Sequence, residues 1–327
     1  MKRITVIGFG SWGIALGLLL DKNGHKITAW DNEAYVTKLL KTRKNEYLPE
    51  IVIPESITIT HDITTATESA EVFVFASTSK GVGITAPKFA PFFTSDKIIT
   101  ICAKGLEETR QIRLSQYLQE LCNSQVATLT GPSHAEEVLK NIPTAVVAAA
   151  EDEKTAEAVQ SIFSADSFRV YTSSDIIGAE IGGALKNVIA LAAGCSDGLG
   201  FGDNTKAALI TRGIAEITRL GVAMGAKEKT FSGLSGIGDL IVTCTSQHSR
   251  NWRAGYSLAQ GKTLNETLTA IGMAVEGVDT AKTALQLAHN HKITMPIIEE
   301  INKVLFQNKS PREAVSDLMQ RELREEK

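Results

Sequence analysis

Within its first thirteen residues the chain carries a short apolar run that leads directly into a glycine pattern. Residues 4–7 read Ile-Thr-Val-Ile, and Gly8-Phe9-Gly10-Ser11-Trp12-Gly13 follows without a spacer. The run predicts a buried strand, and the apolar residues from Ile14 onward predict a helix. Between a strand and a helix, this spacing is the fingerprint of a dinucleotide site. Gly8 would permit the tight turn, Gly10 would let the backbone approach a pyrophosphate at the helix N-terminus, and Gly13 would allow close helix–strand packing.

An acidic residue ends the second apolar run, Ile27–Trp30. Asp31 stands 18 residues after Gly13. A carboxylate at this place accepts a hydrogen bond from a ribose 2′-hydroxyl and repels a 2′-phosphate. Asn32 and Glu33 follow with no arginine among them, although Lys38 is a nearby cation. We expect NAD(H) or NADP(H) as the cofactor, with NAD(H) favoured; the alternative for Asp31 is a helix N-cap.

The first half of the chain alternates apolar runs with amphipathic segments. Strands are predicted over 4–7, 27–30, 72–76, 98–101, 126–130 and 145–149, and helices over 14–23, 34–42, 114–121 and 156–163. Runs of this length suit parallel strands buried on both faces, and their alternation with helices indicates βαβ units. We predict a Rossmann-type doubly wound sheet in an N-terminal domain of residues 1–172.

After about Thr172 strand signals end and the sequence is helical. Asp175 is placed to cap the first long helix, and Pro311 suits the first turn of the last one. Further helices are predicted over 205–224, 252–260, 264–271, 280–291, 296–305 and 311–324. The fold class is therefore α/β, with residues 173–327 forming an all-α substrate and catalytic domain.

Composition excludes several classes of function. The net charge is −3 and like charges form no long run, which argues against nucleic-acid or membrane partners. The four cysteines lack a C-x-x-C spacing, so neither a metal site nor a disulfide framework is expected. The apolar stretch 176–195 contains Glu180, Lys186 and Asn187, which favours a buried helix over a membrane span. The first apolar run is too short for a signal sequence, and we expect a cytoplasmic protein.

A nicotinamide cofactor indicates a dehydrogenase, which transfers a hydride between a carbinol and the nicotinamide. This reaction needs an acceptor for the hydroxyl proton and cations that bind the anionic groups of the substrate. Lys186 is the only cation between Arg169 and Lys206, and Gly182 and Gly183 precede it on one helical face. A lysine partly buried there would have a lowered pKa, which suits a proton acceptor. The alternatives are an ion pair with Glu180 or a lysine whose ammonium reaches solvent.

A second candidate region joins a glycine-rich turn to a polar cluster. Gly236-Ile237-Gly238-Asp239-Leu240 is followed by Ser249-Arg250-Asn251. Arg250 offers a planar fork that matches phosphate or carboxylate, and its neighbours add neutral hydrogen-bonding groups. Taken alone, such residues are more often solvated loop residues than a site.

Nine segments, in order from residue 8 to residue 277, resemble the bacterial NAD(P)-dependent glycerol-3-phosphate dehydrogenase family. They cover most of the chain: residues 8–13, Ala103-Lys104-Gly105-Leu106, Gly131-Pro132-Ser133-His134-Ala135, Gly182-Gly183-Ala184-Leu185-Lys186-Asn187-Val188, Ser196-Asp197-Gly198, Thr211-Arg212-Gly213, residues 236–240, residues 249–251 and Val275-Glu276-Gly277. The resemblance implies interconversion of sn-glycerol 3-phosphate and dihydroxyacetone phosphate, supplying phospholipid synthesis. It also implies a Rossmann domain, a helical domain and a cleft between them.

The resemblance also implies roles for individual residues. Lys186 would be the proton acceptor, and Asp239 would bind substrate and orient it. Lys104 would lie near both cofactor and substrate and polarise the carbonyl oxygen. The remaining implied substrate contacts are Gly131, Ser133, Ser249, Arg250 and Asn251, and the implied cofactor contacts are Ser11, Trp12, Lys104, Ala135, Arg250, Val275 and Glu276. The cofactor contacts predicted from the fingerprint and its spacing are Gly8, Gly10, Gly13 and Asp31.

One departure from the family and several alternatives remain. Many members carry a basic residue shortly after the second strand, where this chain has Asp31-Asn32-Glu33, and this leaves the cofactor preference open. The alternatives are a 3-hydroxyacid-type dehydrogenase, a dehydrogenase with Cys102 or Cys244 as nucleophile, and a non-catalytic NAD-sensing protein. His134 is interpreted as a loop residue without chemistry. A homodimer is compatible with the resemblance, but the sequence carries no sign of the oligomeric state.

Overall fold

A computed structural model describes residues 1–323 and 325 of the chain. It contains two compact units, unit 1 over Met1–Glu180 and unit 2 over Ile181–Lys327. The division falls inside helix α8 (Ile176–Gly198), so the first turn of α8 belongs to unit 1. The boundary predicted after residue 172 lies slightly earlier, in the last strand of the sheet.

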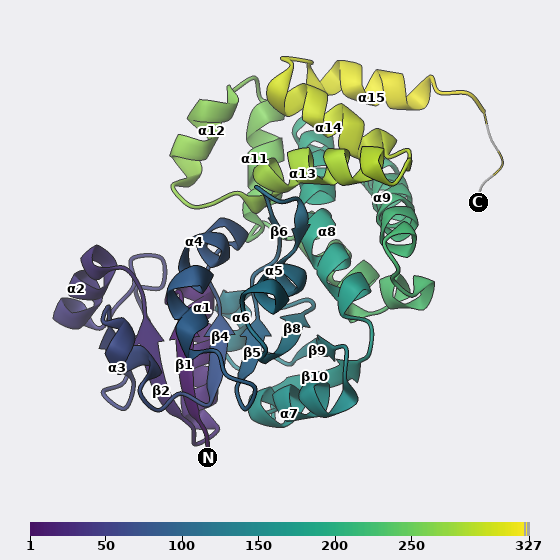
Figure 1. Cartoon of the computed structure of the whole chain (residues 1–327). Helices are drawn as coiled ribbons and strands as arrows, with labels where there is room; N and C mark the ends of the chain where they lie inside the picture. Colours follow the sequence, from purple (N-terminus) through teal and green to yellow (C-terminus); the bar gives the residue numbers. More distant parts are fainter. Residues whose placement is uncertain (324, 326–327) are drawn as a thin grey trace. The chain divides into compact units, whose positions relative to one another are not determined.

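Unit 1 is built on one eight-stranded sheet (Figure 1). Its strand order is β10-β9-β8-β5-β4-β1-β2-β3. The strands are β1 (Arg3–Ile7), β2 (Lys26–Trp30), β3 (Thr58–Thr60), β4 (Val72–Phe75), β5 (Ile98–Ile101), β8 (Gln125–Thr130), β9 (Thr144–Ala150) and β10 (Phe168–Ser173), and a separate hairpin joins β6 (Leu106–Glu107) to β7 (Ile112–Arg113). The order reverses between β1 and β4, which is where doubly wound sheets bind ligands.

Helices cover both faces of this sheet, as predicted. Val72 and Val74 of β4 belong to the apolar cluster that includes one set of helices, whereas Phe73 and Phe75 belong to the cluster on the other face. The first set is α1 (Ser11–Lys22), α2 (Glu33–Thr42), α6 (Ala135–Leu139) and α7 (Glu153–Phe163); the second is α3 (Ile63–Thr67), α4 (Ser79–Phe89) and α5 (Leu114–Leu121), with a 3-10 turn η1 (Ala90–Phe92) after α4. Alternate side chains of one buried strand therefore fill two cores.

The sheet departs from the predicted parallel arrangement at one side. β9 pairs antiparallel with β8 and parallel with β10, so these last two strands run against the others. β10 was not predicted because it lies at the sheet edge, where Arg169 and Tyr171 are exposed and alternate with the buried Phe168 and Val170. β3 and α4 were also missed. A short edge strand and a helix containing Gly81, Gly83 and Pro87 carry weak local signals.

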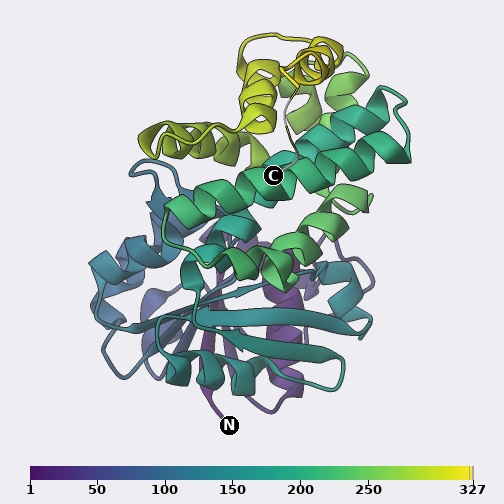
Figure 2. The ribbon, with the colours of Figure 1, turned by 90° about the vertical axis from the view of Figure 1, so that its right-hand side faces the viewer.

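Unit 2 is helical in the part that the structure describes (Figure 2). Its elements are the remainder of α8, α9 (Asp203–Ala223), the 3-10 helix η2 (Glu228–Ser232), the π-helix η3 (Leu234–Gly238), α10 (Asp239–Thr245), α11 (Arg250–Ala259), α12 (Leu264–Ile271), α13 (Glu276–Asn290), α14 (Pro296–Phe306) and α15 (Pro311–Met319). Five of the six helices predicted here after α8 agree closely with α9 and α11–α14. The last ends earlier than predicted, and Arg324 lies outside the described residues.

Helix α8 is the core helix of unit 2. By length and composition it could cross a membrane, but 94% of its most apolar window is buried inside the protein. A helix that is apolar on all sides is expected in a protein core. Its N-terminus is capped as predicted, because Asp175 Oδ1 accepts a hydrogen bond from the N–H of Gly178 at 2.9 Å.

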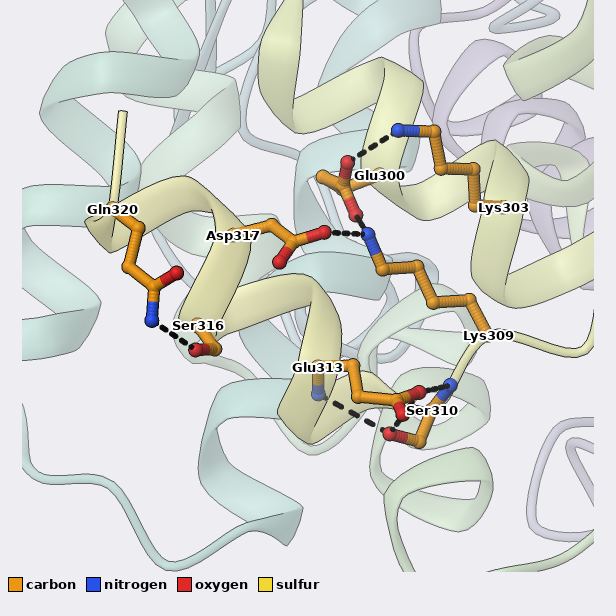
Figure 3. A network of polar contacts seen from close by, with 8 residues as sticks. All are labelled: Glu300, Lys303, Lys309, Ser310, Glu313, Ser316, Asp317 and Gln320. Atoms are coloured by element: carbon orange, nitrogen blue, oxygen red, sulfur yellow. Dashed lines mark hydrogen bonds and ion pairs between the residues drawn. The ribbon is translucent and has the colours of Figure 1, made fainter. Parts of the chain in front are cut away.

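Ion pairs hold the hairpin of α14 and α15 together (Figure 3). The Lys309 ammonium lies between Glu300 of α14 and Asp317 of α15. Ser310 and Glu313 form a capping box at the start of α15, and Pro311 occupies the first turn as predicted.

A buried carboxyl group caps α14 from a neighbouring helix. Glu216 of α9 accepts hydrogen bonds from the N–H groups of Ile297 (2.9 Å) and Ile298 (3.4 Å). Burial raises the pKa of Glu216 to about 7 from its ordinary value of 4.5, against the opposite effects of these N–H groups and of Arg219. The folded state thus binds this proton more tightly than the unfolded chain. The stability that this contributes is full below pH 4.5 and is lost as the pH rises through 7.

Replacement of Glu216 by glutamine should remove this pH dependence, because an amide keeps an acceptor oxygen but never ionises. Between pH 4 and pH 8 the wild type should lose about 3 kcal/mol of its free energy of unfolding through Glu216, and the Glu216→Gln variant should not. Urea unfolding of both proteins at several pH values measures this change. A stability difference that stays constant across this range would contradict the assignment.

Candidate active site

The glycine fingerprint occupies the turn between β1 and α1, and two of its glycines are required by close contacts. Gly8 has φ +88°, and a Cβ atom there would lie 2.6 Å from Cβ of Ser77, which follows β4. A Cβ atom at Gly13 would lie 2.0 Å from the carbonyl oxygen of Gly8. Gly10 instead faces open space, with nothing within 4 Å of a Cβ atom. The turn is therefore tight on its inner side and open where a ligand would approach.

The N-terminus of α1 fits a bound phosphate group. Its N-cap is Gly10, so no side chain caps the first N–H groups, and the first turn carries no acidic residue. Uncapped N–H groups and the helix dipole together favour an anion. The indole N–H of Trp12 is also buried without a hydrogen-bond partner among the described residues. These donors suit the pyrophosphate of a dinucleotide.

Asp31 is tied to the fingerprint turn. Its Oδ2 accepts a hydrogen bond from the N–H of Phe9 at 2.7 Å, and its Oδ1 accepts from the N–H of Asn32 at 2.7 Å. The alternative that Asp31 caps α2 is wrong, because Asn32 is the N-cap and accepts from the N–H of Tyr35. Asp31 instead joins the end of β2 to the turn that follows β1.

Three residues predicted to bind substrate come together in unit 1. Lys104 follows β5, and Gly131 and Ser133 follow β8, the neighbouring strand. The Lys104 ammonium donates to the carbonyl oxygen of Gly131 at 2.9 Å and lies 3.5 Å from Oγ of Ser133. Ala135 begins α6, with His134 as its N-cap residue. The carboxyl ends of the two strands thus present one ammonium group with a hydroxyl beside it.

The second lysine lies in unit 2 and is deeply buried. Lys186 of α8 is 4% exposed and forms an ion pair with Asp239, the first residue of α10, which is fully buried. The ammonium also lies 2.8 Å from Oγ1 of Thr243. A Cβ atom at Gly182 would be 2.3 Å from the carbonyl oxygen of Ser235, so this glycine lets α8 approach η3, which precedes α10. Burial disfavours the charged ammonium, whereas the Asp239 carboxylate favours it.

The alternative partner of Lys186 belongs to another network. Glu180 accepts hydrogen bonds from the N–H of Ser115 at 2.8 Å and from the Arg113 guanidinium at 2.8 Å. The carboxylate therefore lies at the start of α5, and this explains how a buried glutamate in an apolar helix is stabilised. The alternative of an ion pair between Lys186 and Glu180 is wrong.

The polar cluster 249–251 joins α11 to neighbouring helices. Ser249 Oγ accepts from the N–H of Trp252 and caps α11, and one Arg250 nitrogen donates to the carbonyl oxygen of Ala274 at 2.8 Å. Asn251 is buried, donates to Oδ1 of Asn187 and accepts from the N–H of Gly277, both at 2.9 Å. Val275 and Glu276 lie at the N-terminus of α13.

Cysteine chemistry receives no support from the structure. Cys102 and Cys244 are both buried, and burial raises the pKa of the Cys244 thiol to about 12 and that of Cys102 further still. A thiol that stays protonated is a poor nucleophile.

Sequence reasoning gave no role to two residues next to Lys186. Thr243 lies four residues after Asp239 in α10, so its hydroxyl reaches the same ammonium. Asn187 follows Lys186 directly and bonds to Asn251. The i, i+4 spacing of Asp239 and Thr243 would have revealed the first, had the turn been read as leading into a helix.

Comparison with known proteins agrees with this geometry in both units. A family model described as NAD-dependent glycerol-3-phosphate dehydrogenase N-terminus matches residues 3–156, and the model of the C-terminus matches residues 175–316. A glycerol-3-phosphate dehydrogenase (NAD(P)+) of Fusobacterium nucleatum is 51% identical over 98% of both chains, and one of Agathobacter rectalis is 51% identical over 98% of this chain and 97% of its own. The crystal structure of the Coxiella burnetii glycerol-3-phosphate dehydrogenase superposes with a TM-score of 0.94 at 34% identity and covers 98% of this chain and 99% of its own. The chain belongs to the NAD-dependent glycerol-3-phosphate dehydrogenase family.

Proposed function

We propose that this protein is an sn-glycerol-3-phosphate dehydrogenase that interconverts sn-glycerol 3-phosphate and dihydroxyacetone phosphate. The observation that carries the proposal is the buried pair of Lys186 and Asp239 in a chain whose other unit holds a dinucleotide fingerprint. A protein that only senses a dinucleotide has no use for such a pair. If the protein were a 3-hydroxyacid-type dehydrogenase, we would expect its sequence to match the models of that family instead of those of glycerol-3-phosphate dehydrogenase.

Lys186 moves the proton in the proposed reaction. In the oxidative direction its neutral amine accepts the proton of the C2 hydroxyl, and the C2–O bond becomes the carbonyl. Bound NAD(P)+ supplies the acceptor for the hydride that leaves C2. In the reductive direction the Lys186 ammonium protonates the oxygen on C2. Asp239 stabilises the ammonium form, and the Thr243 hydroxyl fixes where the nitrogen lies.

The other predicted residues bind and orient. Lys104 places a positive charge where it can polarise the carbonyl oxygen of dihydroxyacetone phosphate. Ser133 beside it offers a hydroxyl group to the substrate. Asn251 acts mainly through structure, because its amide links α8, α11 and the start of α13.

Arg250 is the proposed phosphate ligand. One of its nitrogens is held by the carbonyl oxygen of Ala274, which fixes the plane of the guanidinium and leaves further donors for phosphate oxygens. Replacement by alanine should raise the Michaelis constant for dihydroxyacetone phosphate about tenfold or more, since hydrogen bonds to charged groups contribute about 1.5–3 kcal/mol. Steady-state kinetics at saturating NADH measure this, and an unchanged constant would move the phosphate site elsewhere.

The direct test of the function follows NADH and NADPH oxidation separately, with dihydroxyacetone phosphate as the acceptor. Oxidation that depends on dihydroxyacetone phosphate is expected, and glycerol 3-phosphate should accumulate in equal amount. Oxidation with a 3-oxoacid but not with dihydroxyacetone phosphate would favour the hydroxyacid alternative.

Further expectations concern the preferred cofactor and the assembly. We propose NAD(H) as the preferred cofactor because Asp31 follows β2 and no arginine accompanies it. A cytoplasmic homodimer that supplies glycerol 3-phosphate for phospholipid synthesis is the accompanying proposal. Light scattering of the purified protein tests the dimer.

A further inference from the structure

The peptide groups of Phe9, in the middle of the glycine fingerprint, are held from both sides by side chains of other segments. The N–H of Phe9 donates to Asp31, and its carbonyl oxygen accepts from the hydroxyl of Tyr35 at 3.1 Å. The Phe9 ring is fully buried and reaches Gly17 of α1. The turn that would carry the pyrophosphate is therefore fixed by residues at and after the end of β2.

The Tyr35 hydroxyl is itself held by a third segment. Its oxygen accepts a hydrogen bond from the amide of Asn45, which is buried in the loop between α2 and β3. The Asn45 amide oxygen accepts from the N–H of Tyr47 at 2.7 Å, so the orientation of its donor is fixed. A tyrosine has one proton to donate, and here that proton goes to Phe9. Tyr35 has none left for a ligand.

Other donors near the end of β2 are also engaged. The N–H of Asn32 donates to Asp31, and the N–H of Tyr35 donates to the Asn32 side chain, so the N-terminus of α2 is capped. The Arg43 guanidinium donates to the carbonyl oxygens of Ile53, Pro54 and Ile57. A 2′-phosphate needs donors or cations; the N–H groups of Asn32 and Tyr35 are already used, and Nε and Nη2 of Arg43 donate to carbonyl oxygens of the loop after α2.

The charges that act on the Tyr35 hydroxyl are negative. Burial raises the pKa of the Tyr35 hydroxyl, opposed by the hydrogen bond from Asn45, and the charges of Asp31 and Glu46 add to the rise. Glu33 stands in the first turn of α2. A ribose hydroxyl can still donate to the Asp31 carboxylate, because its two oxygens can accept more hydrogen bonds than they already do. A phosphate can only accept, and it would be repelled.

We propose that Tyr35 and Asn45 are positioning residues that set the preference for NAD(H) over NADP(H), because they hold Phe9 and thereby the carboxylate of Asp31. The inference rests on the proposed function and names two residues that act on the cofactor through others. The bond from the ribose 2′-hydroxyl to Asp31 exists only with NAD(H), since NADP(H) carries a phosphate there. A disturbed Asp31 therefore penalises NAD(H) selectively, whereas a merely loosened turn would weaken both cofactors.

Two nearly isosteric variants test this. Tyr35→Phe removes the hydroxyl, and Asn45→Asp replaces the donor by an acceptor that draws the Tyr35 proton away from Phe9. Dissociation constants of NADH and NADPH are measured for the whole chain by fluorescence without substrate, so the test is independent of dehydrogenase activity. The wild type should bind NADH at least tenfold more tightly, and both variants should reduce this ratio about tenfold, as the loss of one buried hydrogen bond allows.

The matched control is Tyr171→Phe, which removes a hydroxyl from the opposite edge of the sheet, in β10. Its ratio should equal that of the wild type. Equal weakening of both cofactors in Tyr35→Phe would reduce Tyr35 to a structural role and overturn the proposal. So would a wild type that prefers NADPH. Failure to reduce dihydroxyacetone phosphate, with the binding ratios as expected, would instead remove the proposed function and leave the cofactor preference in place.

Discussion

Replacement of Lys186 by alanine should abolish most turnover while NADH binds as before. The change removes the proton-transfer group, and general acid–base catalysis contributes about 10²–10⁴-fold to a rate. The dinucleotide fingerprint lies in unit 1, and Lys186 lies in unit 2. Stopped-flow or steady-state assays give the turnover, and NADH fluorescence titration gives the binding. Turnover that survives within tenfold, about 1.4 kcal/mol of barrier, would show that another group moves the proton.

A second variant separates proton transfer from loss of the ion pair. Alanine leaves the Asp239 carboxylate buried without its cation, which destabilises a protein by about 3–5 kcal/mol. The Lys186→Arg variant keeps the positive charge next to Asp239, but a guanidinium does not release its proton near neutral pH. We expect it to unfold close to the wild-type temperature and to remain inactive in oxidation. An active arginine variant would mean that charge alone, and no proton transfer, is required at this position.

Local sequence patterns predicted the parts of the fold that depend on local physics. The run 4–7, the glycines after it and the apolar face of α1 indicate a strand, a turn and a helix, and the structure has these with their ends within three residues of those predicted. The caps at Asp175 and Pro311 are equally local. Such features need no knowledge of distant residues.

What the sequence could not predict depends on neighbours in space. An apolar run such as 145–149 fits a parallel or an antiparallel strand equally well, so the reversal of β9 is set by its pairing with β8 and β10. The exposed alternate residues of β10 obscured it as a strand. The hydrogen-bond partners of buried side chains also depend on neighbours in space. Glu180 and Lys186 lie close in sequence, yet Glu180 bonds to Arg113 and Ser115 because these begin α5 beside it.

In the candidate site, too, some contacts follow from family motifs and others follow from packing. The resemblance placed Lys186 and Asp239 together, although 53 residues separate them, and the structure has them as an ion pair. It assigned Asn251 to the substrate, which stays a prediction, and the structure adds that its amide bonds to Asn187 and Gly277. Motifs indicate which residues matter in a family, but the hydrogen-bond partners of a buried amide follow from packing.

Replacement of Gly255 by alanine should cause the largest loss of stability in unit 2. Helices α8 and α11 cross with their backbones in contact. A Cβ atom at Gly255 would lie 1.9 Å from the carbonyl oxygen of Leu191, and one at Gly194 would lie 2.0 Å from that of Trp252. Backbone atoms cannot turn aside as a flexible side chain can, so the helices must separate. Overpacking of this kind costs about 3 kcal/mol, which corresponds to roughly 6–12 °C in the unfolding temperature.

The crossing also matters for the proposed chemistry, because α8 carries Lys186 and α11 begins with Arg250. The Gly255→Ala enzyme, assayed below its lowered unfolding temperature, should show a raised Michaelis constant for dihydroxyacetone phosphate together with a reduced turnover. Gly202→Ser is the matched control, since a Cβ atom at Gly202 meets nothing within 4 Å and serine is a favoured residue at the N-cap of α9. Its unfolding temperature should stay near that of the wild type. If Gly255→Ala were as stable as this control, the backbones of α8 and α11 could not be in contact at Gly255, and the prediction would be wrong.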